Sequence, residues 1–162
     1  MDVDLACRAL LGFVFAAAAI GKLRSPVNFA ESLAGLGIKH AKRPMAAAVI
    51  GAEALCVVFL VLLPPLGYVL ALLLLAAFSA GIALTIKSQR VVRCNCFGAG
   101  GKQLGVPHLV RNGLLGLVAL VGLAAGQLPA MGPQSLVALG LGAFLSLLFI
   151  RWDDLTYLFT SD

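Results

Sequence analysis

Long apolar runs separated by short polar or basic stretches dominate this sequence. Five runs can be delimited, each close to the roughly 20 residues that an α-helix needs to cross a bilayer. They lie at residues 5–23, 45–63, 68–86, 109–125 and 135–152. None shows the period-two alternation of a membrane β-strand, so backbone hydrogen bonding in lipid requires helices. The pattern predicts an all-α integral membrane bundle.

Proline and glycine mark the tight connections between these runs. Residues 64–67 read Pro-Pro-Leu-Gly, and we expect a hairpin there because proline ends a helix and glycine permits a turn. Residues 127–133 are expected to connect the fourth and fifth runs in the same way. The fifth run is short and starts rich in glycine. The expected fold is therefore a four-helix bundle plus a fifth transmembrane helix.

Composition agrees with a protein that lives in the lipid bilayer. Of the 162 residues, 61% are hydrophobic and 12% are charged, and the mean hydropathy is +1.03. Soluble domains carry about 25% charged residues. The first residues, Met1-Asp2-Val3-Asp4, are acidic where a cleavable signal is basic, so we expect a retained first helix. The length leaves no room for a further module, and residues 1–162 are expected to form one multi-pass membrane domain.

Basic residues are unevenly distributed between the two sides of the predicted bundle. Eleven of the 12 lie on the side of the 22–43 and 87–108 loops and the C-terminus. They are Lys22, Arg24, Lys39, Lys42, Arg43, Lys87, Arg90, Arg93, Lys102, Arg111 and Arg151. Arg8 alone lies on the other side. By the positive-inside rule the N-terminus is outside and the 87–108 loop is cytoplasmic. The same rule accounts for the net charge of +5, which therefore does not indicate nucleic acid.

Cys94 and Cys96 are the leading candidates for chemistry. Only Asn95 separates them, so a disulfide between them closes a small ring in poor geometry, typical of labile, catalytic disulfides. Neighbouring basic residues such as Arg93 favour the thiolate and raise its reactivity. Two alternatives stay open. The two thiolates could bind a soft metal such as monovalent copper or mercury, or the two cysteines could be incidental.

Cys7 and Cys56 lie in the first and second runs, in the halves nearer the outside. They could meet across an antiparallel helix pair as a second redox couple. Free cysteine is also common as a small buried residue, and we favour this structural role for Cys7 and Cys56.

Glu53 is the acidic residue that falls inside a predicted span, where an ionisable group is costly and faces a partner in the bundle interior. Lys22, at the end of the first run, and Arg111, at the start of the fourth, are the candidate partners. A structural ion pair and a proton-handling role are both open. Asn112 accompanies Arg111 at a helix start, where both could reach the cysteine loop. His40 and His108 have no metal-ligand spacing and are expected to be solvated.

Several of these segments together resemble the MauE family, the methylamine-utilisation membrane proteins related to DoxX-like proteins. They are Gly21-Lys22-Leu23, Glu53, Cys94-Asn95-Cys96-Phe97-Gly98 and Arg111-Asn112. The resemblance covers about residues 5–150, and Cys-x-Cys-Phe-Gly followed by Arg-Asn is its most specific part. It implies a four-helix core broadly like that of DsbB and vitamin K epoxide reductase. It also implies a role in maturing the disulfide-rich small subunit of methylamine dehydrogenase with a thioredoxin-like, MauD-like partner.

The leading hypothesis is a membrane thiol–disulfide redox protein that acts through Cys94 and Cys96, with Arg111 supporting the thiolate. No cofactor is expected; quinone coupling, as in DsbB-like proteins, stays open but no residue marks it. One alternative is a soft-metal transporter that uses the cysteine pairs, and another is a non-catalytic assembly scaffold. An exported substrate would need the reactive thiols outside, whereas the charge count places them inside. Either electrons cross the membrane through Cys7 and Cys56, or the predicted orientation is reversed.

Overall fold

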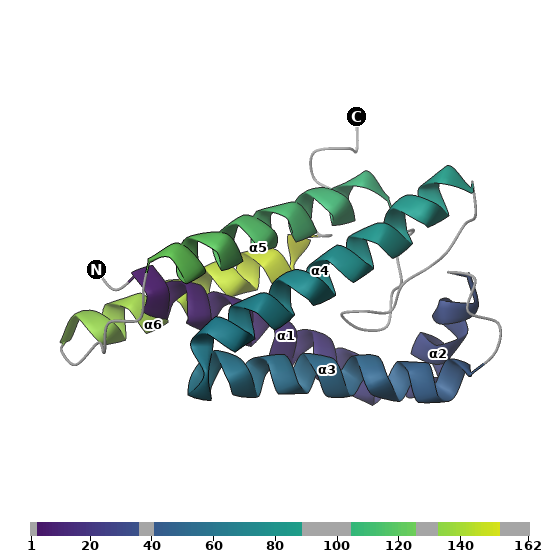
Figure 1. Ribbon diagram of the computed structural model, residues 1–162, viewed down its shortest axis with the longest axis horizontal. Helices are drawn as coiled ribbons and strands as arrows, with labels where there is room; N and C mark the ends of the chain where they lie inside the picture. The colour runs from purple at the N-terminus through teal and green to yellow at the C-terminus, as the bar shows by residue number, and fades with distance from the viewer. Residues whose placement is uncertain (1–2, 36–40, 89–104, 126–132, 153–162) are drawn as a thin grey trace.

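A computed structural model describes residues 3–35, 41–88, 105–125 and 133–152, and this part of the chain is helical without strands. Six helices occur in these ranges (Figure 1). They are α1 Val3–Arg24, α2 Pro26–Gly35, α3 Lys42–Leu62, α4 Pro64–Lys87, α5 Val106–Ala124 and α6 Pro133–Ile150. The prediction of an all-α integral membrane protein is confirmed.

Proline begins almost every helix. It stands in the first turn of all helices after α1: Pro26, Pro44, Pro64 with Pro65, Pro107 and Pro133. The first-turn amide of a helix has no intrahelical acceptor, so proline loses nothing there and its fixed φ angle suits the helix. The prolines therefore set where the helices start.

The hairpin between α3 and α4 is tighter than the sequence predicted. The expected turn at 64–67 is wrong in its placement, because α4 already begins at Pro64 and only Leu63 separates the two helices. Gly67 lies inside α4, where a Cβ atom would sit 2.5 Å from the backbone nitrogen of Leu60. Glycine is needed at this position for the close approach of the two backbones, not for the turn.

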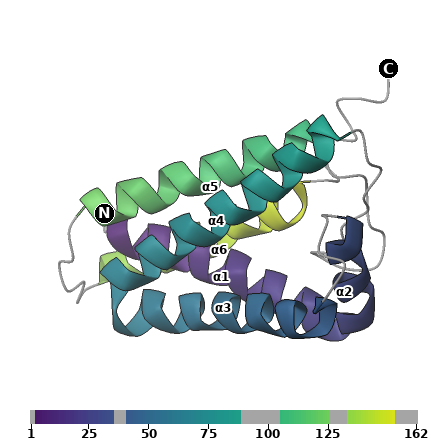
Figure 2. The same ribbon diagram turned by 45° about the vertical axis from the view of Figure 1, so that its right-hand side comes forward.

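Helix α1 lies at the centre of the bundle. It packs against α3, α5 and α6, while α4 packs against both α3 and α5 (Figures 1 and 2). The contact between α1 and α6 is close: a Cβ atom at Gly142 would lie 2.6 Å from the backbone oxygen of Ala6. The core at the middle of the bundle includes Leu11, Leu60 and Leu115, each no more than 1% exposed.

The outer surface of the bundle is apolar, as lipid contact requires. Val61 is 71% exposed and Leu136 is 74% exposed. Within the described ranges, four helices are long and apolar enough to cross a membrane, namely α1, α3, α4 and α5. Helix α6 is apolar but shorter, over Ser135–Ile150. The chain is a multi-pass membrane protein.

Helix α2 was not predicted, because the sequence around it reads as part of a basic loop. Its inner face carries Phe29, Ala30 and Leu33, which pack against Ala46 of α3 in a small core of their own. The helix lies beside the N-terminal part of α3 (Figure 2). It therefore adds an apolar wall at the end of the bundle where α1 ends and α3 begins.

Candidate functional site

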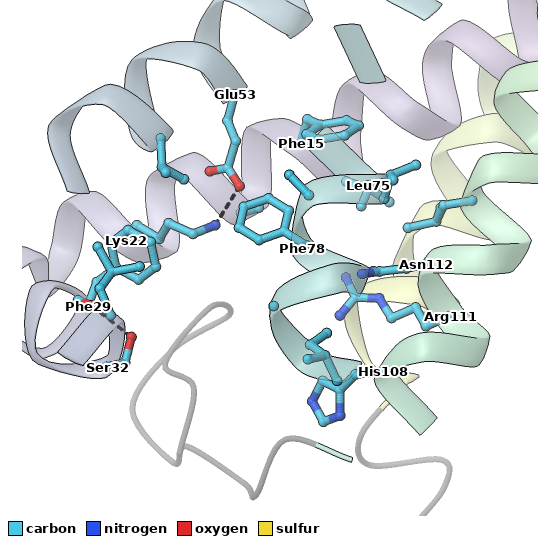
Figure 3. Close-up of a pocket in the computed structure, with 18 of the residues that line it drawn as sticks. Phe15, Lys22, Phe29, Ser32, Glu53, Leu75, Phe78, His108, Arg111 and Asn112 are labelled. Atoms are coloured by element: carbon cyan, nitrogen blue, oxygen red, sulfur yellow. Dashed lines mark hydrogen bonds and ion pairs between the residues drawn. The ribbon is translucent and has the colours of Figure 1, made fainter. Parts of the chain in front are cut away.

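A cavity of about 290 Å³ lies at this end of the bundle. Side chains from α1, α2, α3, α4 and α5 line it (Figure 3). Its walls are mostly apolar, with Phe15, Leu75 and Leu115 on the side toward the core. A small number of polar groups face the same space, so the cavity combines apolar walls with a few fixed polar groups, as ligand sites do.

Lys22 and Glu53 form a buried ion pair at the cavity. The Nζ atom of Lys22 donates to Oε1 of Glu53 at 2.6 Å, and each residue is 1% exposed. Lys22 comes from the last turn of α1 and Glu53 from the middle of α3, so the pair joins two helices 31 positions apart in the chain. Figure 3 shows the two side chains pointing toward each other. A buried charge needs such a partner, and the predicted pairing of Glu53 with Lys22 is present in the structure.

Two phenylalanine rings flank the lysine. The Nζ atom lies 5.3 Å from the ring centroid of Phe29 in α2 and 5.3 Å from that of Phe78 in α4. Both distances are within the range of cation–π attraction, which strengthens when the cation is withdrawn from water. Lys22 therefore links four helices, α1 to α4, through one ion pair and two ring contacts.

Helix α5 supplies the polar side of the cavity opposite Lys22. His108, Arg111 and Asn112 all line the cavity, since Arg111 and Asn112 follow His108 by three and four positions and share its side of α5. The Nδ2 atom of Asn112 donates to Oγ of Ser79 in α4 at 3.3 Å. Arg111 is only 4% exposed. The expectation that His108 is solvated holds only in part, because the residue is half-buried and its Nδ1 atom lies away from solvent. Its spacing of three residues from Arg111, which places both on one side of a helix, is the sequence signal that could have identified His108 as a cavity residue.

A second polar cluster lies near the other end of α1. Tyr68, fully buried in α4, donates its hydroxyl to Oδ1 of Asp4 at 2.8 Å, and Arg8 donates to Oδ2 of the same carboxylate. The interpretation that Glu53 alone is acidic within a span is wrong, because α1 starts at Val3 and includes Asp4. A carboxylate one turn before an arginine is a helix-pair signal that could have identified this cluster.

Cys7 and Cys56 are both buried in the same central core cluster. Both are free thiols, and Sγ of Cys56 donates to the backbone oxygen of Gly67 at 3.6 Å. Their role as a second redox pair stays a prediction. Within the described ranges, no group of three or more His, Cys, Asp or Glu side chains is arranged to hold a metal ion.

The other predicted site residues, Arg93, Cys94 and Cys96, lie outside the described residues, as does His40. The structure thus brings together Lys22, Glu53, Arg111 and Asn112 around one cavity. The sequence did not identify Phe29 and Phe78 as part of this site.

Comparison with known proteins connects this arrangement to one family. The sequence model of the family described as "Methylamine utilisation protein MauE" matches residues 2–125. The match includes the helices that line the cavity and the segment that carries Cys94 and Cys96. No curated protein and no solved structure gives a significant match. Since the matched region covers most of the 162 residues, the chain belongs to the MauE family of methylamine utilisation proteins.

Proposed function

We propose that this protein is a membrane thiol–disulfide redox protein that exchanges electrons with a thioredoxin-like partner through Cys94 and Cys96. One observation carries the proposal: a family match that spans both cysteines, at a spacing typical of labile dithiols. Within methylamine utilisation, the substrate would be an exported disulfide-rich protein such as the small subunit of methylamine dehydrogenase.

The exchange is a two-step transfer of two electrons. The Cys94 thiolate attacks the disulfide of the partner, forming one S–S bond while the second partner sulfur leaves as a thiolate. The Cys96 thiolate then attacks Cys94 in this mixed disulfide. The products are a Cys94–Cys96 disulfide and a reduced partner, so two electrons pass to the partner; the reverse sequence oxidises the partner.

Chain connectivity limits how far these thiols can lie from the helices that line the cavity. Cys94 follows the end of α4, Lys87, by seven residues, so even a fully extended chain keeps it within about 25 Å of Lys87. Cys96 precedes the start of α5, Val106, by ten residues, which keeps it within about 36 Å of Val106. His108 and Arg111 lie in the first two turns of α5, beside Val106. In the proposal, Arg111 supports the thiolate electrostatically, and the Lys22–Glu53 pair fixes α1 against α3 on the other side of the cavity.

Trapping of the mixed disulfide tests the proposal. A Cys96→Ser variant in membranes, offered oxidised thioredoxin, should accumulate a reducible adduct through Cys94, because the second step is blocked. The Cys94→Ser/Cys96→Ser variant is the matched control and should give none. A Cys7→Ala/Cys56→Ala variant should still form the adduct when Cys96→Ser is added. Absence of any adduct, together with stoichiometric mercury binding by the wild type, would contradict the redox function and favour metal handling.

The orientation of the Cys94 loop is a separate prediction. The positive-inside rule gives a cytoplasmic loop. In intact cells a membrane-impermeant thiol reagent should therefore label Cys94 only after permeabilisation. Rapid labelling of intact cells would reverse the predicted orientation and place the thiols on the side of an exported substrate.

A further inference from the structure

The cavity contains a buried hydrogen-bond acceptor that no described residue satisfies. Glu53 uses Oε1 to accept from Lys22, but its Oε2 atom has no hydrogen-bond partner among the described residues. The residue is 1% exposed and lines the cavity. An unsatisfied buried carboxylate oxygen is costly, so a group that donates to it from within the cavity would stabilise the site.

Lys22 offers the complementary group beside this oxygen. Its ammonium has three N–H donors, and among the described residues its hydrogen-bond acceptor is Oε1 of Glu53. Acceptor and donor thus stand next to each other, because Nζ of Lys22 lies 2.6 Å from Oε1, the other oxygen of the same carboxylate. A hydroxyl group matches both, because it donates one hydrogen bond and accepts others. An ether oxygen of the same size could accept but could not donate.

The cavity walls indicate what kind of molecule carries this hydroxyl. Phe15, Phe29 and Phe78 line the space together with Leu75 and Leu115. Aromatic side chains favour offset or edge-to-face contact with another ring. The volume of about 290 Å³ is at the lower end of the range of small-molecule pockets, so it suits one compact ring system and not a two-chain lipid.

We propose that this cavity binds a small hydroxyl-bearing aromatic molecule, a phenol in the broad sense, whose O–H donates to Oε2 of Glu53. The oxygen of this hydroxyl accepts a hydrogen bond from Lys22, and the ring lies against Phe15, Phe29 and Phe78. The site goes beyond the proposed thiol function, since none of its groups is a cysteine. Binding should therefore be the same in the Cys94→Ser/Cys96→Ser variant, which separates the two proposals.

A matched pair of probes tests the site. The full chain in lipid nanodiscs is titrated with 1-naphthol and with 1-methoxynaphthalene, and binding is followed by probe fluorescence against empty nanodiscs. We expect saturable binding of 1-naphthol with an affinity about tenfold higher than that of the methyl ether, the ratio that one buried hydrogen bond supports. In Glu53→Gln this preference should fall to about threefold or less.

Filling the cavity locates the binding. Ala18 lines the cavity and is 5% exposed, so Ala18→Leu should reduce 1-naphthol binding at least about tenfold. Val49→Phe fills the same space from α3 and is the second variant should Ala18→Leu fail to fold. Phe144 lies in α6 and is 63% exposed, so the Phe144→Ala variant is the control and should bind 1-naphthol as the wild type does. Binding no greater than to empty nanodiscs, equal affinity for the two probes, or unchanged binding in a folded cavity-filling variant would each overturn the proposal.

Discussion

Breaking the Lys22–Glu53 ion pair should destabilise the protein strongly. The loss of stability should depend on which of the two residues is replaced. At the observed 2.6 Å, and with an effective dielectric constant of about 20, the Coulomb attraction is about 6 kcal/mol. Desolvation of both groups offsets much of this attraction. Removing one partner leaves the other as an uncompensated buried charge, which costs about 3–5 kcal/mol.

The two single variants should differ because the surroundings of the two charges differ. In Glu53→Met the remaining ammonium keeps its contacts with Phe29 and Phe78, each worth about 0.5–2 kcal/mol. In Lys22→Met the carboxylate has no described partner left for either oxygen. We expect losses of about 3 kcal/mol for Glu53→Met and about 5 kcal/mol for Lys22→Met.

The double variant Lys22→Met/Glu53→Met completes a double-mutant cycle with the two single variants. Since it leaves no buried charge and keeps similar volume, its stability should return to within about 1–2 kcal/mol of the wild type. Reversible unfolding in mixed micelles by sodium dodecyl sulfate titration measures all three. Lys87→Met and Glu31→Met make the same changes at exposed positions and should cost less than about 0.5 kcal/mol. Single-variant losses below about 1 kcal/mol, or a double variant equal to the sum of the singles, would refute the reasoning.

Two further changes test the packing of the bundle in the same unfolding assay. Gly142→Ala should cost about 1–3 kcal/mol of stability, because the new Cβ atom would lie 2.6 Å from a backbone oxygen of α1. Gly140→Ala is the control and should be neutral, because nothing lies within 4 Å of its Cβ position. Equal effects of the two changes would contradict the close approach of α1 and α6. Tyr68→Phe should cost about 1–3 kcal/mol, because it leaves Oδ1 of Asp4 without its described donor. A neutral Tyr68→Phe would show that this hydrogen bond adds nothing to stability.

The transmembrane helices could be predicted well from the sequence because hydropathy and length determine them. The predicted spans 5–23, 45–63, 68–86 and 109–125 correspond to α1, α3, α4 and α5 within a few residues. Helix α2 could not be predicted in this way. Its ten residues are too short to span a bilayer, and its inner face becomes apparent only when α3 lies against it.

The site was predictable only where charge forces a contact. A buried Glu53 requires a cation, and Lys22 was one of two candidates in the sequence. Nothing in the sequence says which of Lys22 and Arg111 makes the bond, because both lie at the same end of the bundle. The aromatic residues Phe29 and Phe78 were missed for another reason: phenylalanine is common in any apolar helix, so its presence alone carries no signal.

Polar contacts add to the packing that fixes α1 within this bundle. Lipid tails are as apolar as the helix surfaces, so apolar contact gives little preference for one register over another. Asp4 joins α1 to Tyr68 of α4, and Lys22 joins it to Glu53 of α3. The two positions are 18 residues apart, or about 27 Å along the helix axis. Two contacts near opposite ends therefore favour one rotation and one tilt of α1, in addition to its close packing against α6 at Gly142. We therefore expect Tyr68→Phe, which removes one of these two contacts, to weaken 1-naphthol binding although Tyr68 does not line the cavity.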